Sequence, residues 1–154
     1  MVALDRTRIG RTVSGDPVEI SRETVVGFAR ALGFQDPVYQ DAQSARAAGH
    51  PDVLAPPTYA VALSATTAHL ILDDPGLGLD YSRVVHGEQS LHVNEAVHAG
   101  DVLTATTRLS DIRVAGRHEL IETETTLAHP DGSVACVLRS VSVSRGTAPE
   151  GSSS

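Results

Sequence analysis

TYAVALSATTAHLIL, residues 58–72, is the segment from which the rest of the chain can be understood. Ala, Val, Leu and Ile occupy most of the circumference that these residues would have as an α-helix. A helix that is apolar on nearly every side is buried, because an exposed helix keeps one polar face toward water. The segment therefore predicts a long buried helix at the centre of the protein.

The chain after this helix has the periodicity of β-strands. The loop DDPGLGLDYS, residues 73–82, precedes stretches in which Thr, Val and Leu alternate, as half-buried strands require. These stretches are Arg83–Asn94, Val102–Val114, Glu119–His129 and Ser133–Ser144. The dipeptide Asp131-Gly132, in the break before the last stretch, is a strong hairpin signal. We expect an antiparallel meander.

Two shorter helices are predicted before the central one. In Ser21–Leu32 the apolar residues recur at helical spacing, with Ser21 as the cap and Gly33 as the stop. A second helix, Asp41–Ala48, begins at its capping aspartate. Helices followed by antiparallel strands make an α+β fold with one helix buried against a curved sheet. Residues 1–145 are expected to form this single domain, and the small, polar residues 146–154 a disordered tail.

The composition excludes several classes of function. The chain has 154 residues, 41% of them hydrophobic, which suits one domain with one core. Its formal net charge of -7 argues against nucleic-acid binding, which needs a basic surface. An acidic carrier protein would be repelled unless an arginine patch or a partner subunit receives it. All 12 basic residues are arginine, so lysine Schiff-base chemistry is excluded.

Other motifs point to a cytoplasmic protein without metal or cofactor. The N-terminus has no apolar signal-peptide region, and no apolar run approaches the length of a membrane span. The histidines lack metal-site spacing, and dinucleotide, Walker and GxSxG motifs are absent. The single cysteine, Cys136, lies in an alternating apolar run and is expected to be a buried structural thiol.

Three loop segments carry a resemblance to a known family. ALGFQDPVYQDAQSARAAGHPDVLAPPTY, residues 31–59, resembles the signature of MaoC-like (R)-specific hydratases and dehydratases. LGLDYSRVVHGEQ, residues 77–89, is similar to a small actinobacterial group that resembles half of a fatty-acid synthase dehydratase domain. EAVHAGDVL, residues 95–103, is similar to a strand-turn-strand of hot-dog acyl-thioester proteins. The resemblance covers residues 15–145 and implies one hot-dog domain, a curved antiparallel sheet wrapped around one long buried helix.

The signature departs from the family at its two catalytic positions. The catalytic Asp of the family falls on Phe34, the catalytic His on Tyr39, and the structural Asn-Pro on Asp36-Pro37. Water addition to a 2-enoyl thioester needs groups that move protons to and from carbon and oxygen. Phe34 carries no proton, and Tyr39, with an ordinary pKa of about 10, is a poor base at neutral pH.

The resemblance therefore implies the non-catalytic, acyl-chain-binding subunit of a heterodimeric (3R)-hydroxyacyl-thioester dehydratase of fatty-acid or polyketide biosynthesis. A MaoC-like partner would supply the Asp–His pair, and the substrate would be carried by acyl carrier protein or coenzyme A. Phe34 would then enlarge an apolar wall of the acyl channel, or it fills core space beside the helix. Dimer formation follows from the fold, because a single such sheet leaves an edge strand to be paired.

Other residues of this chain are candidates for catalysis in place of the missing Asp–His pair. Asp36 shares a side with Phe34 in an extended loop, or it replaces the family Asn in loop hydrogen bonds. His86 and Glu88 are expected on one strand face, toward the thioester, or they form a packing motif at the dimer seam. Gly87 between them would allow close approach of a ligand. The full set of expected substrate-binding residues is Phe34, Asp36, Tyr39, Pro57, Thr58, Tyr59, His86 and Gly87.

Two other functions remain as alternatives. The chain could be a homodimeric dehydratase, thioesterase or cyclase that uses Asp36, Tyr39, His86 or Glu88. It could also be an acyl-binding module without any chemistry. Activity of the chain alone, activity only with a partner, and binding without turnover distinguish the three hypotheses.

Overall fold

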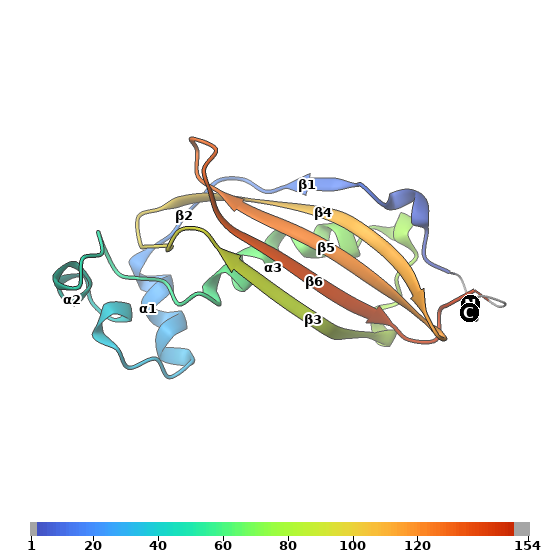
Figure 1. The fold of residues 1–154 in the computed structure, drawn as a ribbon, viewed down its shortest axis with the longest axis horizontal. Coiled ribbons are helices and arrows are strands. Elements are labelled where there is room, and N and C mark those ends of the chain that lie inside the picture. Colours follow the sequence, from blue (N-terminus) through green and yellow to red (C-terminus); the bar gives the residue numbers. More distant parts are fainter. Residues whose placement is uncertain (1–2, 150–154) are drawn as a thin grey trace.

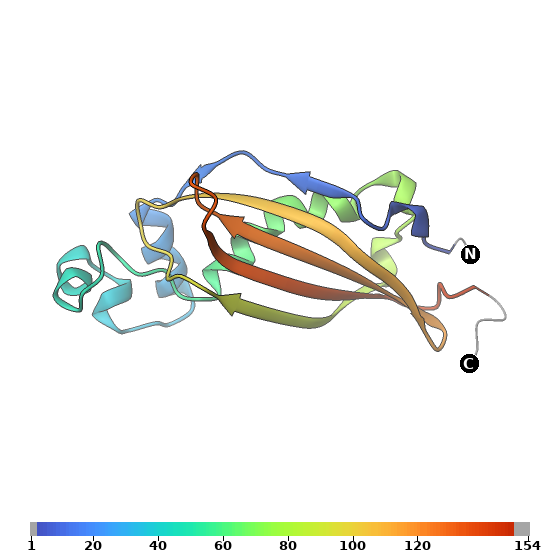
Figure 2. The same ribbon diagram turned by 45° about the horizontal axis from the view of Figure 1, so that its top comes forward.

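The computed structural model describes residues 3–149, in which helices cover one face and one end of an antiparallel sheet (Figures 1 and 2). The helices are α1 (Arg22–Ala31), α2 (Ala42–Ala47) and α3 (Tyr59–Leu72), with short 3-10 turns η1 (Arg6–Arg8), η2 (Pro37–Tyr39), η3 (Pro75–Leu77) and η4 (Tyr81–Arg83). The strands are β1 (Thr12–Ser14), β2 (Val18–Glu19), β3 (Val84–Val93), β4 (Val102–Ala115), β5 (His118–Ala128) and β6 (Val134–Ser144). None of the helices in this part of the chain is long and apolar enough to cross a membrane.

The helix caps and the hairpin turn that the sequence predicts are present in the structure. Ser21 caps α1 by accepting a hydrogen bond from Thr24 N at 3.1 Å. Asp41 caps α2 by accepting from the backbone of Gln43 and Ser44. The hairpin between β5 and β6 turns at Gly132, whose φ of 89° is the left-handed conformation that glycine adopts most readily.

The order of the strands differs from the expected meander. The sheet has the order β1-β4-β5-β6-β3, with β2 also paired to β4, and every pairing is antiparallel. Only β4, β5 and β6 form a meander, whereas β3 lies beyond β6 at the edge. The connection from β3 therefore crosses the sheet to β4, which local periodicity does not predict. The short strands β1 and β2 were not expected either, because three and two residues are too few for an alternating pattern.

The central helix lies on the concave face of the sheet and packs chiefly against β4. Its inner side buries Tyr59, Ala60, Ser64, Thr67 and Ile71. The helix is central, as predicted, but in the single chain the sheet covers only one of its sides and no described residue covers the other. The uncovered side exposes Ala62, Ala65, Thr66, His69 and Leu70.

A chain of buried hydroxyl groups joins this helix to the sheet. Thr107 Oγ1 on β4 lies 2.7 Å from Thr67 Oγ1 on α3 and 2.7 Å from Thr125 Oγ1 on β5. Thr67 and Thr107 are fully buried. A buried hydroxyl without a hydrogen bond costs free energy, so the mutual hydrogen bonds of the three threonines favour one position of the helix across two strands.

The N-terminal segment is tied to the sheet by one buried carboxylate. Glu119, on β5, is fully buried, and its Oε2 accepts a hydrogen bond from Leu4 N at 3.0 Å. Its Oε1 accepts from Arg6 Nη2 at 3.0 Å. At the other end of the chain Thr147 is buried, whereas residues 150–154 of the predicted disordered tail lie outside the described residues.

We predict that Thr107→Val lowers the free energy of unfolding by about 1–2 kcal/mol, because Thr67 and Thr125 lose the hydroxyl between them. Urea unfolding followed by circular dichroism measures the change. The control is Thr126→Val, a half-buried position on the opposite face of β5, which should change stability by less than about 0.5 kcal/mol. Equal losses for both variants would contradict a special role of the hydroxyl chain.

We predict that Glu119→Ala lowers the free energy of unfolding by about 2 kcal/mol or more, because it leaves Leu4 N–H buried without an acceptor. Glu119→Gln retains an acceptor and should cost less. Thermal unfolding of the two variants and the parent chain measures their order of stability. A more destabilised Glu119→Gln would show that the carboxylate, and not the acceptor, anchors the segment.

Candidate functional site

The loop after α1 holds two aromatic rings side by side. Gly33, with φ of 77°, turns the chain out of the helix, and η2 then brings Tyr39 back toward Phe34. The ring centroids lie 5.1 Å apart with an interplanar angle of 63°, an edge-to-face pair. Gln40 Nε2 donates to Phe34 O at 2.7 Å and holds the two ends of the loop together. The positions of the expected dyad are therefore adjacent, and both are aromatic.

Asp36 has a structural task in this loop. It is exposed, and its Oδ1 accepts a hydrogen bond from Val38 N at 3.0 Å at the start of η2. This is the loop-bonding alternative considered from the sequence, since the carboxylate is occupied by backbone. Asp36 lines neither of the two cavities beside α3.

A small apolar cavity of about 140 Å³ lies next to Tyr39. Its walls come from the loop, the start of α3 and the end of β3, and they are Tyr39, Leu54, Ala55, Pro56, Pro57, Ala60, Val93, Ala96, Val97 and Cys136. The only titratable side chains among these residues are Tyr39 and Cys136. Burial raises the pKa of the Cys136 thiol, which keeps the thiol protonated and unreactive at neutral pH.

The other expected residues at the start of α3 have different surroundings. Pro57 lines the small cavity, and Thr58 is exposed without a capping hydrogen bond. Tyr59 belongs to the core: its ring packs edge-on against Phe28, and its hydroxyl lies 3.0 Å from Thr24 Oγ1. The structure thus brings Tyr39 and Pro57 together, and separates Tyr59 from them.

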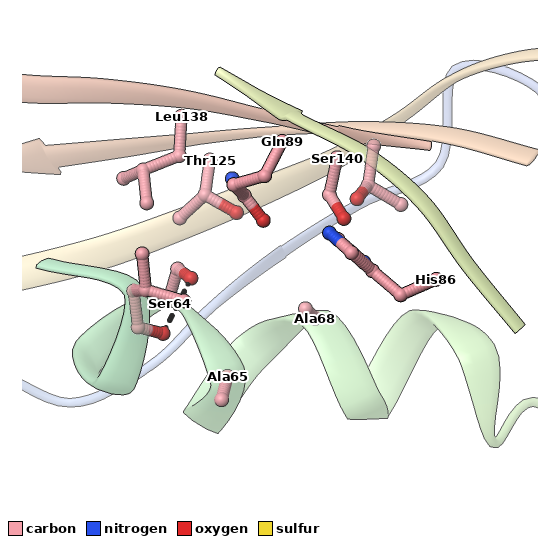
Figure 3. A pocket seen from close by; sticks show the side chains of 10 residues that line it. Ser64, Ala65, Ala68, His86, Gln89, Thr125, Leu138 and Ser140 are labelled. Atoms are coloured by element: carbon pink, nitrogen blue, oxygen red, sulfur yellow. Dashed lines mark hydrogen bonds between the residues drawn. The ribbon is translucent and has the colours of Figure 1, made fainter. Parts of the chain in front are cut away.

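A larger cavity of about 390 Å³ lies between α3 and the concave face of the sheet (Figure 3). Helix α3 contributes Val61, Ser64, Ala65 and Ala68, and the strands contribute His86, Gln89, Thr123, Thr125, Leu138 and Ser140. In Figure 3 the His86 ring points into this space from the edge strand, toward Ser140. The lining combines hydroxyls with aliphatic groups, and none of its residues is a carboxylate.

His86 and Glu88 do not share a face, so that expectation is wrong. The register of β3 against β6 shifts between them: His86 pairs with Ser142, and Glu88 pairs with Val141. One extra residue in a strand reverses the alternation of the side chains that follow. Glu88 consequently lies in a group on the other side of the sheet, with Arg113, Glu122 and Arg139 among its neighbours.

Gly87 is the extra residue of this bulge. A Cβ at this position would lie 3.0 Å from Val143 Cγ2 and 3.2 Å from Val141 O. The missing side chain therefore leaves room for the neighbouring strand β6. The close approach that the glycine permits in this chain is between two strands.

Sequence reasoning missed most residues of the larger cavity. Ser64, Ala65 and Ala68 occur within the helix that looked uniformly apolar, and their small size was the available signal. Gln89 and Ser140 could not be found from periodicity, because the bulge reverses one strand and the pairing of β3 with β6 is non-local. The structure also brings two histidines together: His50 Nδ1 lies 3.0 Å from His98 Nε2, and burial lowers the pKa of His98.

Comparisons with known proteins identify the family of the chain. The family model described as the FAS1-like dehydratase domain region matches residues 7–137. A UPF0336 protein of Saccharopolyspora erythraea is 40% identical over 151 residues, which are 96% of this chain and 97% of that protein.

The chain is also similar to solved structures of dehydratases. The HadBC (3R)-hydroxyacyl-ACP dehydratase complex of Mycobacterium tuberculosis has a TM-score of 0.79 at 20% identity, over 88% of this chain and 96% of that chain. A MaoC-like dehydratase has a TM-score of 0.78 at 25% identity, over 90% of this chain and 42% of that chain. These similarities confirm the predicted α+β hot-dog fold, and by sequence the chain belongs to the UPF0336 family, within the FAS1-like dehydratase domain region.

Proposed function

We propose that this chain is the non-catalytic, acyl-chain-binding subunit of a heterodimeric (3R)-hydroxyacyl-thioester dehydratase. One observation carries the proposal. The loop that resembles the catalytic loop of MaoC-like dehydratases presents a Phe34–Tyr39 ring pair, and the adjoining small cavity is lined by apolar groups, Tyr39 and a protonated thiol. That lining contains no carboxylate and no imidazole, the two groups that the proposed proton transfers require.

The chemistry explains why this loop needs a partner. Dehydration removes a proton from C2 of the 3-hydroxyacyl group, and the C3 hydroxyl takes up a proton and leaves as water. The electron pair of the C2–H bond becomes the new C2=C3 double bond. An Asp–His pair can carry both protons, whereas Phe34 can carry none. The partner subunit would therefore supply the pair.

The uncovered surfaces of the chain support a partner of the same fold. Strand β3 pairs with β6 on one side only, so its other edge leaves backbone groups unpaired. Val85 and Val93 on this strand are 40% and 43% exposed, and Leu70 on α3 is 44% exposed. A second hot-dog subunit that adds its own edge strand to β3 would cover both the strand and the open side of α3.

This pairing gives the larger cavity a role. If the two edge strands run antiparallel, the start of β3 lies beside the end of the partner's edge strand. The cavity at His86 and Ala68 would then lie close to the partner's catalytic loop, and not to the Phe34–Tyr39 loop. We infer that the acyl chain of a substrate held by the partner extends into this cavity between α3 and the sheet.

A second candidate function rests on His86. It points into the larger cavity and could act as a general base if the chain formed a homodimer. The expected acid partner, Glu88, lies on the other side of the sheet. This alternative therefore lacks a second proton carrier, and an acyl-binding module without chemistry is the remaining alternative.

We predict that the purified chain alone does not dehydrate a (3R)-hydroxyacyl thioester, and that a mixture with a MaoC-like subunit that has an intact Asp–His loop does. Absorbance of the enoyl thioester measures turnover. In the mixture, Tyr39→Phe should leave kcat within about twofold, because the tyrosine transfers no proton, whereas Ala at the partner's catalytic histidine should abolish it. Activity of the chain alone that His86→Ala removes would instead establish the homodimeric enzyme. Acyl binding without turnover, both by the chain alone and by the mixture, would support an acyl-binding module without chemistry.

We predict that Ala68→Leu, which fills part of the larger cavity, raises KM for long-chain substrates about tenfold or more and leaves short-chain substrates unaffected. The half-buried Ala68 lines the cavity, whereas the control, Ala47→Leu at the exposed end of α2, lines neither cavity. Steady-state kinetics of the mixture over a series of chain lengths measures the effect. An equal effect at all chain lengths would argue against acyl binding in this cavity.

A further inference from the structure

An arginine cluster lies at the end of the sheet opposite the Phe34–Tyr39 loop (Figure 1). A cavity of about 310 Å³ is present where η4 ends, β5 begins and β6 ends. It is lined by Arg83, Arg117, His118, Arg145 and Gly146. No part of the chemistry proposed above uses these residues.

Backbone contacts hold the cluster together. Arg145 N and Nε donate to Arg83 O at 3.1 and 3.2 Å, which fixes two of the arginines relative to each other. Gly146 N donates to His118 Nδ1 at 3.0 Å, which links the end of β6 to the start of β5. A Cβ on Gly146 would lie 3.7 Å from Arg83 Nη1, so this guanidinium lies over the glycine.

The positive charge of the cluster is largely uncompensated. Within residues 3–149, the only carboxylate in an ion pair with it is Asp80, whose Oδ2 lies 3.3 Å from Arg83 Nε. Arg117 and Arg145 form no ion pair with any residue in this part of the chain. In a chain of net charge -7, three arginine residues lining one cavity favour the binding of an anion there. The planar guanidinium matches the geometry of phosphate oxygens.

The direction of β3 relates the cluster to catalysis. Arg83 directly precedes Val84, the first residue of β3, whereas Val93, its last residue, lines the small cavity beside Tyr39. The antiparallel pairing proposed above would bring the start of this strand beside the end of the partner's strand. The cluster would then lie close to the partner's catalytic loop.

We propose that Arg83, Arg117 and Arg145 bind the phosphate of the acyl carrier while the thioester lies at the partner's catalytic loop. This inference rests on the proposed function. The shared chemistry is the phosphate of the phosphopantetheine arm, which coenzyme A and holo acyl carrier protein both contain. The non-catalytic subunit would thereby hold the carrier end of the substrate as well as its acyl chain, and an acidic carrier would meet a basic patch on an otherwise acidic chain.

The test compares three thioesters of one (3R)-3-hydroxybutyryl group in the complex of this chain with its MaoC-like partner. The carriers are coenzyme A, holo acyl carrier protein, and N-acetylcysteamine, which has no phosphate. Arg117→Ala, a change in the exposed turn between β4 and β5, should raise KM about tenfold for the first two carriers and leave kcat within about twofold. It should leave kcat/KM for the N-acetylcysteamine thioester unchanged. Arg108→Ala, which removes an exposed arginine from β4, is the matched control and should change none of these constants.

The pattern over the carriers identifies the anion. A rise in KM for both phosphate-bearing carriers supports the pantetheine phosphate, and a rise for coenzyme A alone supports the nucleotide phosphates of the same ligand. A rise for acyl carrier protein alone overturns phosphate recognition in favour of the carrier's protein surface. An equal effect on the N-acetylcysteamine thioester, or the same effect for Arg108→Ala, overturns the site.

Calorimetric binding of coenzyme A to the complex distinguishes failure of this site from failure of the proposed function. Binding that Arg117→Ala weakens, in a complex that never dehydrates substrate, retains the phosphate site and removes the dehydratase function. If the complex dehydrates substrate and Arg117→Ala changes neither KM nor kcat, the dehydratase function stands and the phosphate site is overturned.

Discussion

The structure depends on how much of one helix a curved sheet can cover. Helix α3 packs on the concave face, and the hydroxyl chain from Thr67 through Thr107 to Thr125 connects it to two strands. Because the sheet ends at β3, the other side of the helix and the free edge of that strand stay uncovered together. The same limit leaves a cavity between helix and edge strand. The proposed partner surface and the candidate acyl site therefore have one geometric cause.

The division of labour that we propose follows from where the chain keeps and loses ionisable groups. Phe34 and Tyr39 occupy the positions where the resemblance to MaoC-like dehydratases implies an Asp–His pair, and their rings form an edge-to-face contact. At the opposite end of the sheet, Arg83, Arg117 and Arg145 line one cavity. In the antiparallel pair of subunits that we propose, the arginine end of one chain would lie near the loop end of the other.

Prediction from the sequence succeeded where a signal is local. The cap at Ser21, the hairpin at Asp131-Gly132 and the alternating runs of β4 to β6 depend on neighbouring residues, and the structure has each of them. Prediction failed at β3, because one extra residue at Gly87 reverses the faces on which His86 and Glu88 lie. The bulge depends on contact with β6, more than fifty residues later, so no pattern within β3 contains it.

By itself the sequence determined the helices α1 to α3, the long strands β3 to β6, the α+β class and the aromatic side chains at positions 34 and 39, because helix period, strand period and side-chain chemistry are properties of short segments. Only the tertiary structure decided that β3 is an edge strand, that α3 is covered on one side, and that Arg83, Arg117 and Arg145 share a cavity. The reason is physical: strand order and side-chain convergence are set by packing between segments distant in the chain, and the periodicity of any one segment is the same whichever neighbour it acquires.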